Sequence, residues 1–353
     1  MVHIDGSVIE GGGQIVRIAI GLSALFSKPI DLVNVLKDRA KEGLRAQHLT
    51  GLRLVKEITQ AQVEGDILGS TSISFKPKGI KYGEYLADAG TAGSVCLLLQ
   101  VSLPCILFGK GESKLTLKGG TNVPMAPQID YVVNVFKPML EKFGATFNCK
   151  IVRRGFYPAG NGQIEIDTSG PNELKSVELT DFGEVNYISG EAFVAGVLPF
   201  RMAEEMARTA ENMLRKAVKT RINIKPIKFS QNEAFGNGSG INLVAVTTTG
   251  CYLGGSCLGE RGVQSEEVGR KAAEELLDCI TRKDCVDQYA QDQLIIFMAL
   301  ADGKSSVKTG PITSHTEKAI KVTEMFTDAK FTIKKLDNDC NIIECTGQGQ
   351  NSH

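Results

Sequence analysis

Three separated stretches of the chain share one pattern of apolar and polar positions. Each reads as an amphipathic helix followed by two short alternating segments: LRLVKEITQAQVEGDILGSTSISF, MLEKFGATFNCKIVRRGFYPAGNGQIEI and VTEMFTDAKFTIKKLDNDCNIIECTG. Apolar positions three or four residues apart predict the helix, and strict alternation predicts the two strands. The pattern predicts an α/β (α+β) fold with a repeated unit, although helix–strand alternation in any α/β protein also produces such likeness by chance.

The spacing of these stretches predicts an insertion. When Val63, Phe147 and Phe331 are aligned as the first strand residue of each stretch, the separations are 84 and 184 residues. The second interval is too long by about one hundred residues. We therefore expect a core of three repeats at residues 1–180 and 284–353, interrupted by an insert domain at residues 181–283.

The predicted insert has a different order of helix and strand patterns from the three repeated stretches. A long helical pattern, FVAGVLPFRMAEEMARTAENMLRKAVKT, comes before the strand patterns INIKPIKF and INLVAVTTT and a second helix pattern, SEEVGRKAAEELLDCI. The order β-α-β-β-α predicts a small α/β unit.

Composition narrows the class of protein. The chain has 353 residues, of which 42% are hydrophobic and 23% charged, and it has no long uncharged apolar run. This composition is typical of a globular protein that does not enter a membrane. The N-terminus lacks a signal-peptide profile, and none of the nine cysteines form a CxxC pair, so we expect an intracellular, reducing location.

Charge balance affects how the chain can bind a polyanion. Lysine plus arginine number 40, and aspartate plus glutamate also number 40. A balanced chain has no global field that draws it to nucleic acid. Any phosphate must therefore be held by a local group of residues.

Histidine is scarce, and His315 is the strongest nucleophile candidate. The chain has four histidines, and His3 and His353 lie near the termini. His315 stands in KTGPITSHTEKAIKVTEMF, at the start of a predicted amphipathic helix, where backbone N–H groups favour a phosphate. A neutral imidazole is a good nucleophile toward phosphorus. The competing interpretation is a simple exposed side chain.

The N-terminal segment DGSVIEGGGQIVRIAIGLSALF runs from a short strand through three glycines into a helix. Such a turn lets the backbone approach a phosphate closely. Glu10 before the glycines and Arg17 on the first turns of the helix suit a metal ligand or base beside a phosphate clamp. A purely structural glycine turn is the alternative.

A basic cluster follows in VLKDRAKEGLRAQHLTGLRLVKEI, where Arg39 could hold a terminal phosphate through two hydrogen bonds. The helix is expected to start near Leu44, with Gln47 and His48 in its first turn. A solvated charged face is the alternative.

Three further segments suggest a nucleoside pocket. Gln100 is the lone amide of the apolar helix pattern in GTAGSVCLLLQVSLP, where we expect it to be buried and hydrogen-bonded. Pro127 offers a flat apolar face in GGTNVPMAPQIDYV. Tyr289, Asp292 and Gln293 come early in the helix pattern DQYAQDQLIIFMALADG and combine an aromatic face with a carboxylate and an amide. A satisfied core amide, an ordinary proline turn and helix capping are the competing accounts.

Taken in order, the motifs closely resemble the RNA 3'-terminal phosphate cyclase family. The resemblance runs through DGSVIEGGGQIVR, GLRAQHLTGL, AGSVCLLLQ, GGTNVPMAP, RRGFYPAGNGQ, YAQDQL and the SHT segment, which span nearly all of the chain outside the insert. It implies three repeated βαβαββ-type units like the C-terminal domain of translation initiation factor three, with a smaller α/β insert domain. It also implies that His315 attacks the α-phosphate of ATP, and that the AMP then activates an RNA 3'-phosphate for closure by the 2'-OH.

The resemblance assigns residues to this chemistry. ATP is expected to be held by Gln100, Pro127, Tyr289, Asp292 and Gln293, with adenine between Tyr289 and Pro127. The RNA end is expected at Arg17, Arg39, Gln47 and His48, and a divalent Mg²⁺ or Mn²⁺ at Glu10. Family resemblance also suggests the nucleus if the chain is eukaryotic and the cytoplasm otherwise.

One departure and two rivals stand beside this interpretation. Many relatives have glutamate where this chain has Gln288, so a charge is missing near the nucleotide. A non-catalytic cyclase-like protein of rRNA processing and ribosome assembly shares the fold but lacks the nucleophilic histidine. An enolpyruvyl transferase uses related repeats but needs neither that histidine nor the GLRAQHLTGL segment.

Overall fold

The protein has a mixed α/β fold with four mixed sheets. The computed structural model describes residues 1–353 except 8–11, 38–41, 171–172 and 350–353. The helices are α1 (Gly12–Phe26), α2 (Ala46–Thr59), α3 (Val95–Leu107), α4 (Ile129–Tyr131), η1 (Val132–Phe136), α5 (Lys137–Lys142), α6 (Phe200–Ala217), α7 (Ser265–Arg282), α8 (Gln288–Gln293), α9 (Ile295–Leu300) and α10 (Ser314–Phe326). The strands are β1 (Val2–Asp5), β2 (Ile30–Val33), β3 (Gln62–Glu64), β4 (Ile73–Lys76), β5 (Glu84–Asp88), β6 (Ser113–Gly119), β7 (Asn148–Gly155), β8 (Gly162–Thr168), β9 (Glu178–Leu179), β10 (Val185–Ala195), β11 (Arg221–Phe229), β12 (Ala234–Phe235), β13 (Gly238–Thr247), β14 (Tyr252–Leu258), β15 (Asp302–Thr309), β16 (Lys330–Lys335) and β17 (Asn341–Gln348).

Three of the sheets share one strand order. The orders are β1-β2-β4-β3, β5-β6-β8-β7 and β9-β15-β17-β16, and β12 adds to the outer edge of β7. In each of these orders the first two strands are parallel and the remaining neighbours are antiparallel, whereas the added strand β12 pairs parallel to β7. The expected helix followed by two strands is present in all three predicted stretches, as α2-β3-β4, α5-β7-β8 and α10-β16-β17.

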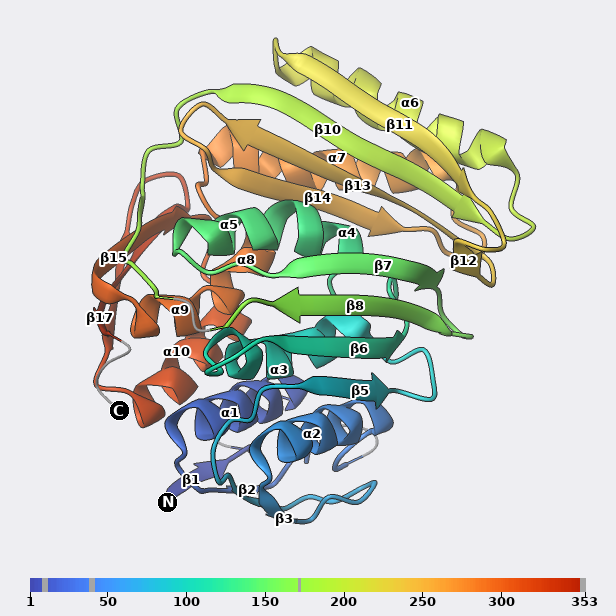
Figure 1. The fold of residues 1–353 in the computed structure, drawn as a ribbon. Helices are drawn as coiled ribbons and strands as arrows, with labels where there is room; N and C mark the ends of the chain where they lie inside the picture. Colours follow the sequence, from blue (N-terminus) through green and yellow to red (C-terminus); the bar gives the residue numbers. More distant parts are fainter. Residues whose placement is uncertain (8–11, 38–41, 171–172, 350–353) are drawn as a thin grey trace.

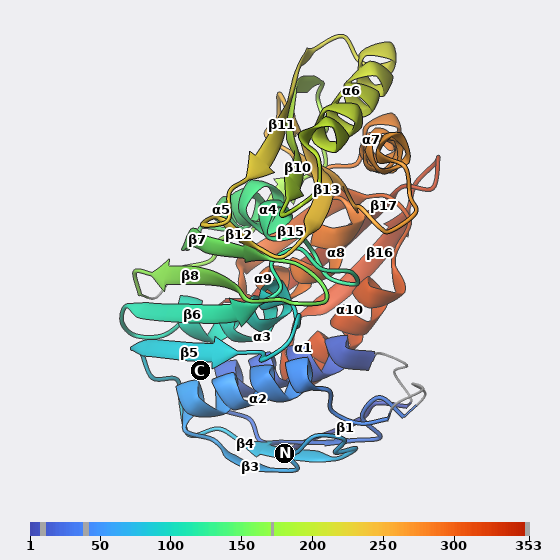
Figure 2. The same cartoon turned by 90° about the vertical axis from the view of Figure 1, so that its right-hand side faces the viewer.

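The segment predicted as an insert contains the fourth sheet, of order β11-β10-β13-β14. Helices α6 and α7 pack together and cover one face of this sheet (Figure 2). On its other side β14 contacts η1. The predicted helix over residues 193–220 is too long, because Phe193–Ala195 end β10 and the helix itself starts at Phe200. Strand β14 was missed, so the observed order has a further strand before α7.

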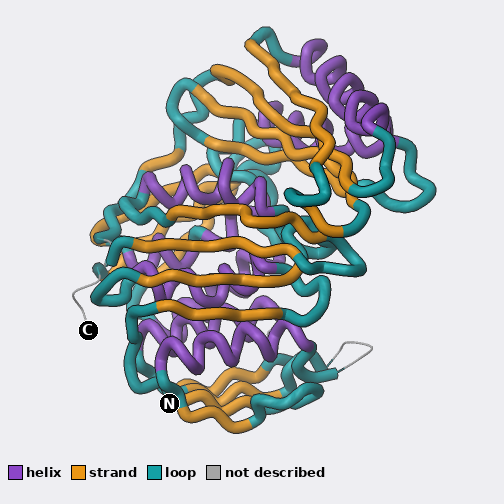
Figure 3. The backbone as a smooth tube through the Cα atoms, turned by 45° about the vertical axis from the view of Figure 1, so that its right-hand side comes forward, coloured by secondary structure: helices purple, strands orange, loops and turns teal. Residues whose placement is uncertain are grey.

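Helices occupy the space between the sheets (Figures 1 and 3). In Figure 3 the N-terminal sheet lies at the bottom and the central sheet lies above it. The sheet of β10, β11, β13 and β14 lies near the top, with helices between the sheets. Helix α1 packs against α2, α3 and α10. Helix α3 is apolar on nearly all sides, as expected of a helix that is enclosed by other elements. Eleven of its thirteen residues are buried. In the described part of the chain, no helix has both the length and the apolar character that a membrane crossing needs.

Candidate functional site

A cleft of about 540 Å³ opens where α1, α3, β14, α8 and the start of α10 meet. This volume suits a small organic ligand. The cleft brings together most of the residues that the sequence suggested, from segments far apart in the chain. Those that line it are Arg17, Gln100, Pro127, Tyr289, Asp292, Gln293 and His315.

Helix α8 is held at the cleft by its N-cap, Asp287. One carboxylate oxygen accepts from the backbone N–H groups of Tyr289 and Ala290, at 3.0 and 2.9 Å. The same oxygen accepts from the hydroxyl of Tyr131 at 2.6 Å, and the other accepts from Gly254 N at 2.8 Å. Burial raises the pKa of Asp287, and these hydrogen bonds oppose the shift. A single buried side chain thus connects α8 to α4 and to β14.

Tyr289 lies on the first turn of α8 with its ring at the cleft wall. Its side chain is 39% exposed. Its ring and that of Tyr131 form a T-shaped pair, with centroids 5.8 Å apart and planes at 79°. The face of such a ring suits a flat aromatic ligand. Pro127, on the loop before α4, lines the same cleft.

His315 occupies the first turn of α10, where Thr313 is the N-cap and accepts from Thr316 N at 3.1 Å. Its Nδ1 lies 2.6 Å from Oε1 of Gln14 on α1. The amide nitrogen of Gln14 donates to Asp292 Oδ2 at 2.6 Å and to the His315 carbonyl at 3.1 Å. Because a carbonyl only accepts, the Gln14 nitrogen must face that side and its oxygen must face the ring. Nδ1 therefore carries the proton, and Nε2 carries the basic lone pair.

A buried amide also fixes the backbone around His315. Gln291 of α8 is 1% exposed, and its nitrogen donates to Thr309 Oγ1 at 2.6 Å. Its oxygen accepts from Thr313 N at 2.9 Å and from Thr316 Oγ1 at 2.6 Å. The first turn of α10 is thus tied to α8 on both sides of His315.

Asp292 and Arg17 form the charged floor of the cleft. Burial raises the pKa of Asp292 to about 6, and the positive charge of Arg17 opposes this shift. Burial lowers the pKa of Arg17 to about 10, and Asp292 opposes that shift. Both groups therefore remain mainly charged at pH 7. A cation at this position is suited to an anionic ligand.

On its other side Arg17 faces a smaller pocket with Gln47 and His48. Gln47 Oε1 accepts from the backbone N–H of Ser94, at the N-cap of α3, at 2.9 Å. His48 Nδ1 accepts from Arg45 N at 3.3 Å, so in the neutral ring the proton is on Nε2. Burial and the charges of Arg17 and Arg45 lower the pKa of His48 to about 4, so the ring is neutral at pH 7.

The first turn of α1 accommodates this second histidine. A Cβ at Gly13 would lie 2.1 Å from His48 Nε2, so only glycine leaves room for the ring. Neighbouring residues of α1 thus receive two histidines, with Gly13 against His48 and Gln14 against His315.

Some sequence expectations need correction or lie outside the described residues. Glu10 and Arg39 fall in undescribed segments. Gln100 is half-buried at the cleft wall rather than enclosed in the core. Helix α2 begins at Ala46, two residues later than expected, because Arg45 is the N-cap.

Sequence reasoning missed Gln14, Asp287 and Gln291. Gln14 lies within the glycine-rich motif, one helical turn before Arg17, and this i, i+3 spacing was the available signal. Asp287 directly precedes the helix pattern, as an N-cap does. Gln291 had no local signal, because its partners are 18 to 25 residues further along the chain.

The side chains near the cleft limit how a metal ion could be bound there. Among the described residues, no group of three or more histidine, cysteine, aspartate or glutamate side chains is arranged to hold one. Mg²⁺ commonly takes only one or two protein carboxylates and completes its shell with phosphate oxygens and water. The cleft therefore fits a metal that arrives with a polyphosphate better than a cage made by the protein alone.

Comparison with known proteins gives consistent matches over nearly the full length. A sequence model of a family described as RNA 3'-terminal phosphate cyclase matches residues 8–333. A protein of that name from Drosophila melanogaster is 40% identical over 350 residues, which cover 99% of this chain and 97% of the relative. One from Pyrobaculum aerophilum is 40% identical over 352 residues, covering 99% of both chains. One from Staphylothermus marinus is 38% identical over 353 residues, again covering 99% of both.

Proposed function

The chain belongs to the RNA 3'-terminal phosphate cyclase family, and we propose that it uses ATP to convert an RNA 3'-terminal phosphate into a 2',3'-cyclic phosphodiester. AMP and pyrophosphate are the other products. The observation that carries the proposed route is the hydrogen bond from His315 Nδ1 to Gln14 Oε1.

In the first step, His315 Nε2 attacks the α-phosphorus of ATP. The N–P bond forms as the bond to pyrophosphate breaks, and pyrophosphate leaves with the electron pair. The ring gains positive charge as it reacts, and its Nδ1–H donates more strongly to Gln14. Asp292 accepts from the other end of the same amide at 2.6 Å, so its negative charge stabilises the imidazolium through Gln14.

The second and third steps use the AMP held by His315. An oxygen of the RNA 3'-phosphate attacks the phosphorus of AMP, the N–P bond breaks, and its electron pair returns to Nε2. The neighbouring 2'-oxygen then attacks the activated 3'-phosphorus, loses its proton to solvent and expels AMP. A phosphate monoester alone is a poor electrophile for a hydroxyl, whereas AMP is a good leaving group.

We assign the two pockets to the two substrates. ATP occupies the cleft beside Gln100, Asp292 and Gln293, with adenine between Tyr289 and Pro127. Support comes from the convergence of these side chains on one cleft of suitable volume. Arg17, Gln47 and His48 receive the RNA end, because a partly buried cation and a neutral Nε2–H donor both suit phosphate oxygens.

Two residues of this proposal lie outside the described part of the chain. Arg39 is proposed to bind the RNA phosphate, and Glu10 to help bind Mg²⁺ or Mn²⁺ together with the triphosphate oxygens. A divalent cation would supply charge neutralisation at the phosphates. Both assignments rest on the family motifs rather than on local geometry.

The domain organisation belongs to the same proposal. We propose three repeated βαβαββ units in residues 1–180 and 284–353, and an insert domain at residues 181–283. The shared strand order of three sheets, and the different order of the fourth, support this division. We also propose an intracellular compartment, which the nine free cysteine thiols support, and family resemblance suggests the nucleus if the chain is eukaryotic.

Incubation with α-³²P-ATP and Mg²⁺, without RNA, tests the proposed route. We expect an acid-labile, alkali-stable AMP adduct on the wild-type chain and none on His315→Ala. His48→Ala is the matched control, since it removes the other histidine beside the first turn of α1 and should still form the adduct. An adduct on His315→Ala would overturn the mechanism, and a wild-type chain without any adduct would favour the non-catalytic ribosome-assembly alternative.

A further inference from the structure

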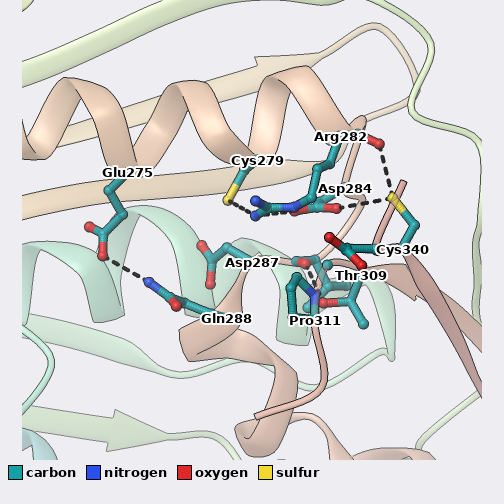
Figure 4. Close-up of polar contacts among 12 residues, drawn as sticks. Glu275, Cys279, Arg282, Asp284, Asp287, Gln288, Thr309, Pro311 and Cys340 are labelled. Atoms are coloured by element: carbon teal, nitrogen blue, oxygen red, sulfur yellow. Dashed lines mark hydrogen bonds and ion pairs between the residues drawn. The ribbon is translucent and has the colours of Figure 1, made fainter. Parts of the chain in front are cut away.

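A carboxylate from the insert segment reaches the wall of the nucleotide cleft. Glu275 projects from α7, and its Oε1 accepts from the Tyr289 hydroxyl at 2.5 Å and from Gln288 Nε2 at 2.9 Å. Its Oε2 accepts from the backbone N–H of Ser256 on β14 at 2.7 Å. Figure 4 shows Glu275 extending from α7 toward Gln288 at the start of α8. One side chain thus joins three elements around the cleft.

Helix α7 is a rigid base for this carboxylate. A Cβ at Gly255 of β14 would lie 2.4 Å from the Ala272 carbonyl oxygen and 2.8 Å from Leu276 Cβ. The helix therefore lies directly on the strand at Ala272, about one turn before Glu275, and at Leu276, the residue after it. Burial raises the pKa of Glu275, and its hydrogen bonds to Tyr289, Ser256 and Gln288 oppose the rise. These donors favour the ionised carboxylate.

The contact restrains a ring that would otherwise be mobile. Tyr289 is 39% exposed, and its ring packs against Tyr131 in a T-shaped arrangement. A tyrosine at the mouth of a cleft loses rotamer freedom when a ligand stacks on it. Because Glu275 already holds the hydroxyl, most of that loss occurs on folding rather than on binding.

Gln288, the residue before Tyr289, also donates a hydrogen bond to Glu275. Gln288 presents an amide N–H to Glu275, which a carboxylate accepts. A glutamate at position 288 would put two carboxylates against each other, and their repulsion would raise the pKa of at least one of them. In this chain the amide lets the Glu275 carboxylate serve both residues.

We propose that Glu275 is a positioning residue for nucleotide binding, which holds the Tyr289 ring in its stacking orientation and through which the segment 181–283 acts on the reaction. The inference rests on the proposed function, since it requires ATP in this cleft. It predicts that Glu275 changes affinity for the nucleotide through Tyr289 and leaves the chemistry at His315 intact.

A double-mutant cycle tests the proposal. Binding of α,β-methylene-ATP with Mg²⁺ is measured by calorimetry for the wild type, Glu275→Ala, Tyr289→Phe and the double variant. We expect each single variant to bind about 3- to 10-fold more weakly, the range set by one side chain that must be ordered on binding. The double variant should bind no more weakly than the weaker single variant, because both changes break the same contact.

Further variants separate positioning from a structural effect. In single-turnover adduct formation, Glu275→Ala should raise the ATP concentration that gives the half-maximal rate and leave the maximal rate within about 2-fold, because binding weakens while the chemical step is unchanged. Gln288→Glu should weaken binding more than Gln288→Ala, and increasingly so as pH rises. Glu274→Ala is the matched control, because its carboxylate pairs with Arg270 on the same helix. It should bind as the wild type does.

The outcomes are distinct. Unchanged affinity in Glu275→Ala, or losses that simply add in the double variant, would overturn the proposal while adduct formation by the wild type still upheld the cyclase route. If Glu275→Ala does not fold, Tyr289→Phe decides, since it removes only one hydroxyl; wild-type affinity in that variant contradicts the inference. A wild type that binds no nucleotide would instead remove the proposed function and this inference with it.

Discussion

The first turns of α2 and α10 each contain a histidine, and the two neutral rings are opposite tautomers. His48 and His315 both lie in the first turn of a helix, and both lie beside the first turn of α1. His48 accepts a backbone N–H at Nδ1, so its neutral ring has the proton on Nε2. His315 donates from Nδ1 to Gln14, so its lone pair is on Nε2. The partner of Nδ1 therefore decides whether the opposite nitrogen is a donor or a nucleophile.

The two rings also differ in how many hydrogen bonds from neighbouring helices orient them. Around His315, amides on α1 and α8 make hydrogen bonds to the ring, to its carbonyl and to the cap of its helix. Around His48, burial and the charges of two arginines keep the pKa low, and one backbone hydrogen bond orients the ring. This difference matches the proposed roles: a nucleophile such as His315 must return to one geometry in every cycle, whereas a phosphate-binding group such as His48 needs only to stay neutral and donate.

Removing the amide that selects the tautomer should have the largest effect. Gln14→Ala leaves His315 free to take the other tautomer and separates it from Asp292. We expect the rate of AMP adduct formation to fall about 10- to 100-fold, as for other partners that orient a reactive imidazole. Single-turnover labelling measures this rate. Gln231→Ala, an exposed amide elsewhere, is the control, and an unchanged rate in Gln14→Ala would show that the amide does not select the tautomer.

Filling the space beside His48 should have an intermediate effect. In Gly13→Ala the new methyl would lie 2.1 Å from His48 Nε2, so the ring must move. We expect a loss of about 1–3 kcal/mol in the free energy of unfolding, as for other overpacked sites. Urea denaturation measures it. The double variant Gly13→Ala/His48→Ala should recover most of the loss, and an equal loss in both backgrounds would mean that the clash is not with His48.

The pH dependence of stability should show the smallest effect. The pKa of His48 is lowered from 6.5 to about 4, so its contribution to stability is present above pH 6.5 and is lost as pH falls toward 4. Asp292 has the opposite sign: its raised pKa of about 6 means that its contribution is present below 3.8 and is lost as pH rises through 6.

Comparing variants separates these opposing contributions. Between pH 7 and pH 5, His48→Gln should lose less stability than the wild type, as read from urea midpoints at constant slope. Equal losses in the two proteins would contradict a partly buried His48 that is neutral at pH 7.

Much of the fold was predictable because it depends on local periodicity. The helix followed by two strands is confirmed at α2-β3-β4, α5-β7-β8 and α10-β16-β17. The errors fell where local signals conflict. Phe193–Ala195 are apolar and continue smoothly into the helical pattern, yet they pair in β10, because strand pairing outweighs local helix propensity. Strand β14, with two consecutive glycines, has weak strand propensity and was missed.

The sequence by itself determined the family, the approximate positions of most elements and His315 as the nucleophile candidate. These follow from short ordered motifs and from periodic patterns, which neighbouring residues suffice to define. Only the tertiary structure decided the state of each histidine. Gln14 and His315 are 301 positions apart, and the contact between Glu275 and Tyr289 joins α7 to α8. Such hydrogen bonds depend on how α1, α7, α8 and α10 pack, and packing between distant segments leaves no periodic trace in the sequence.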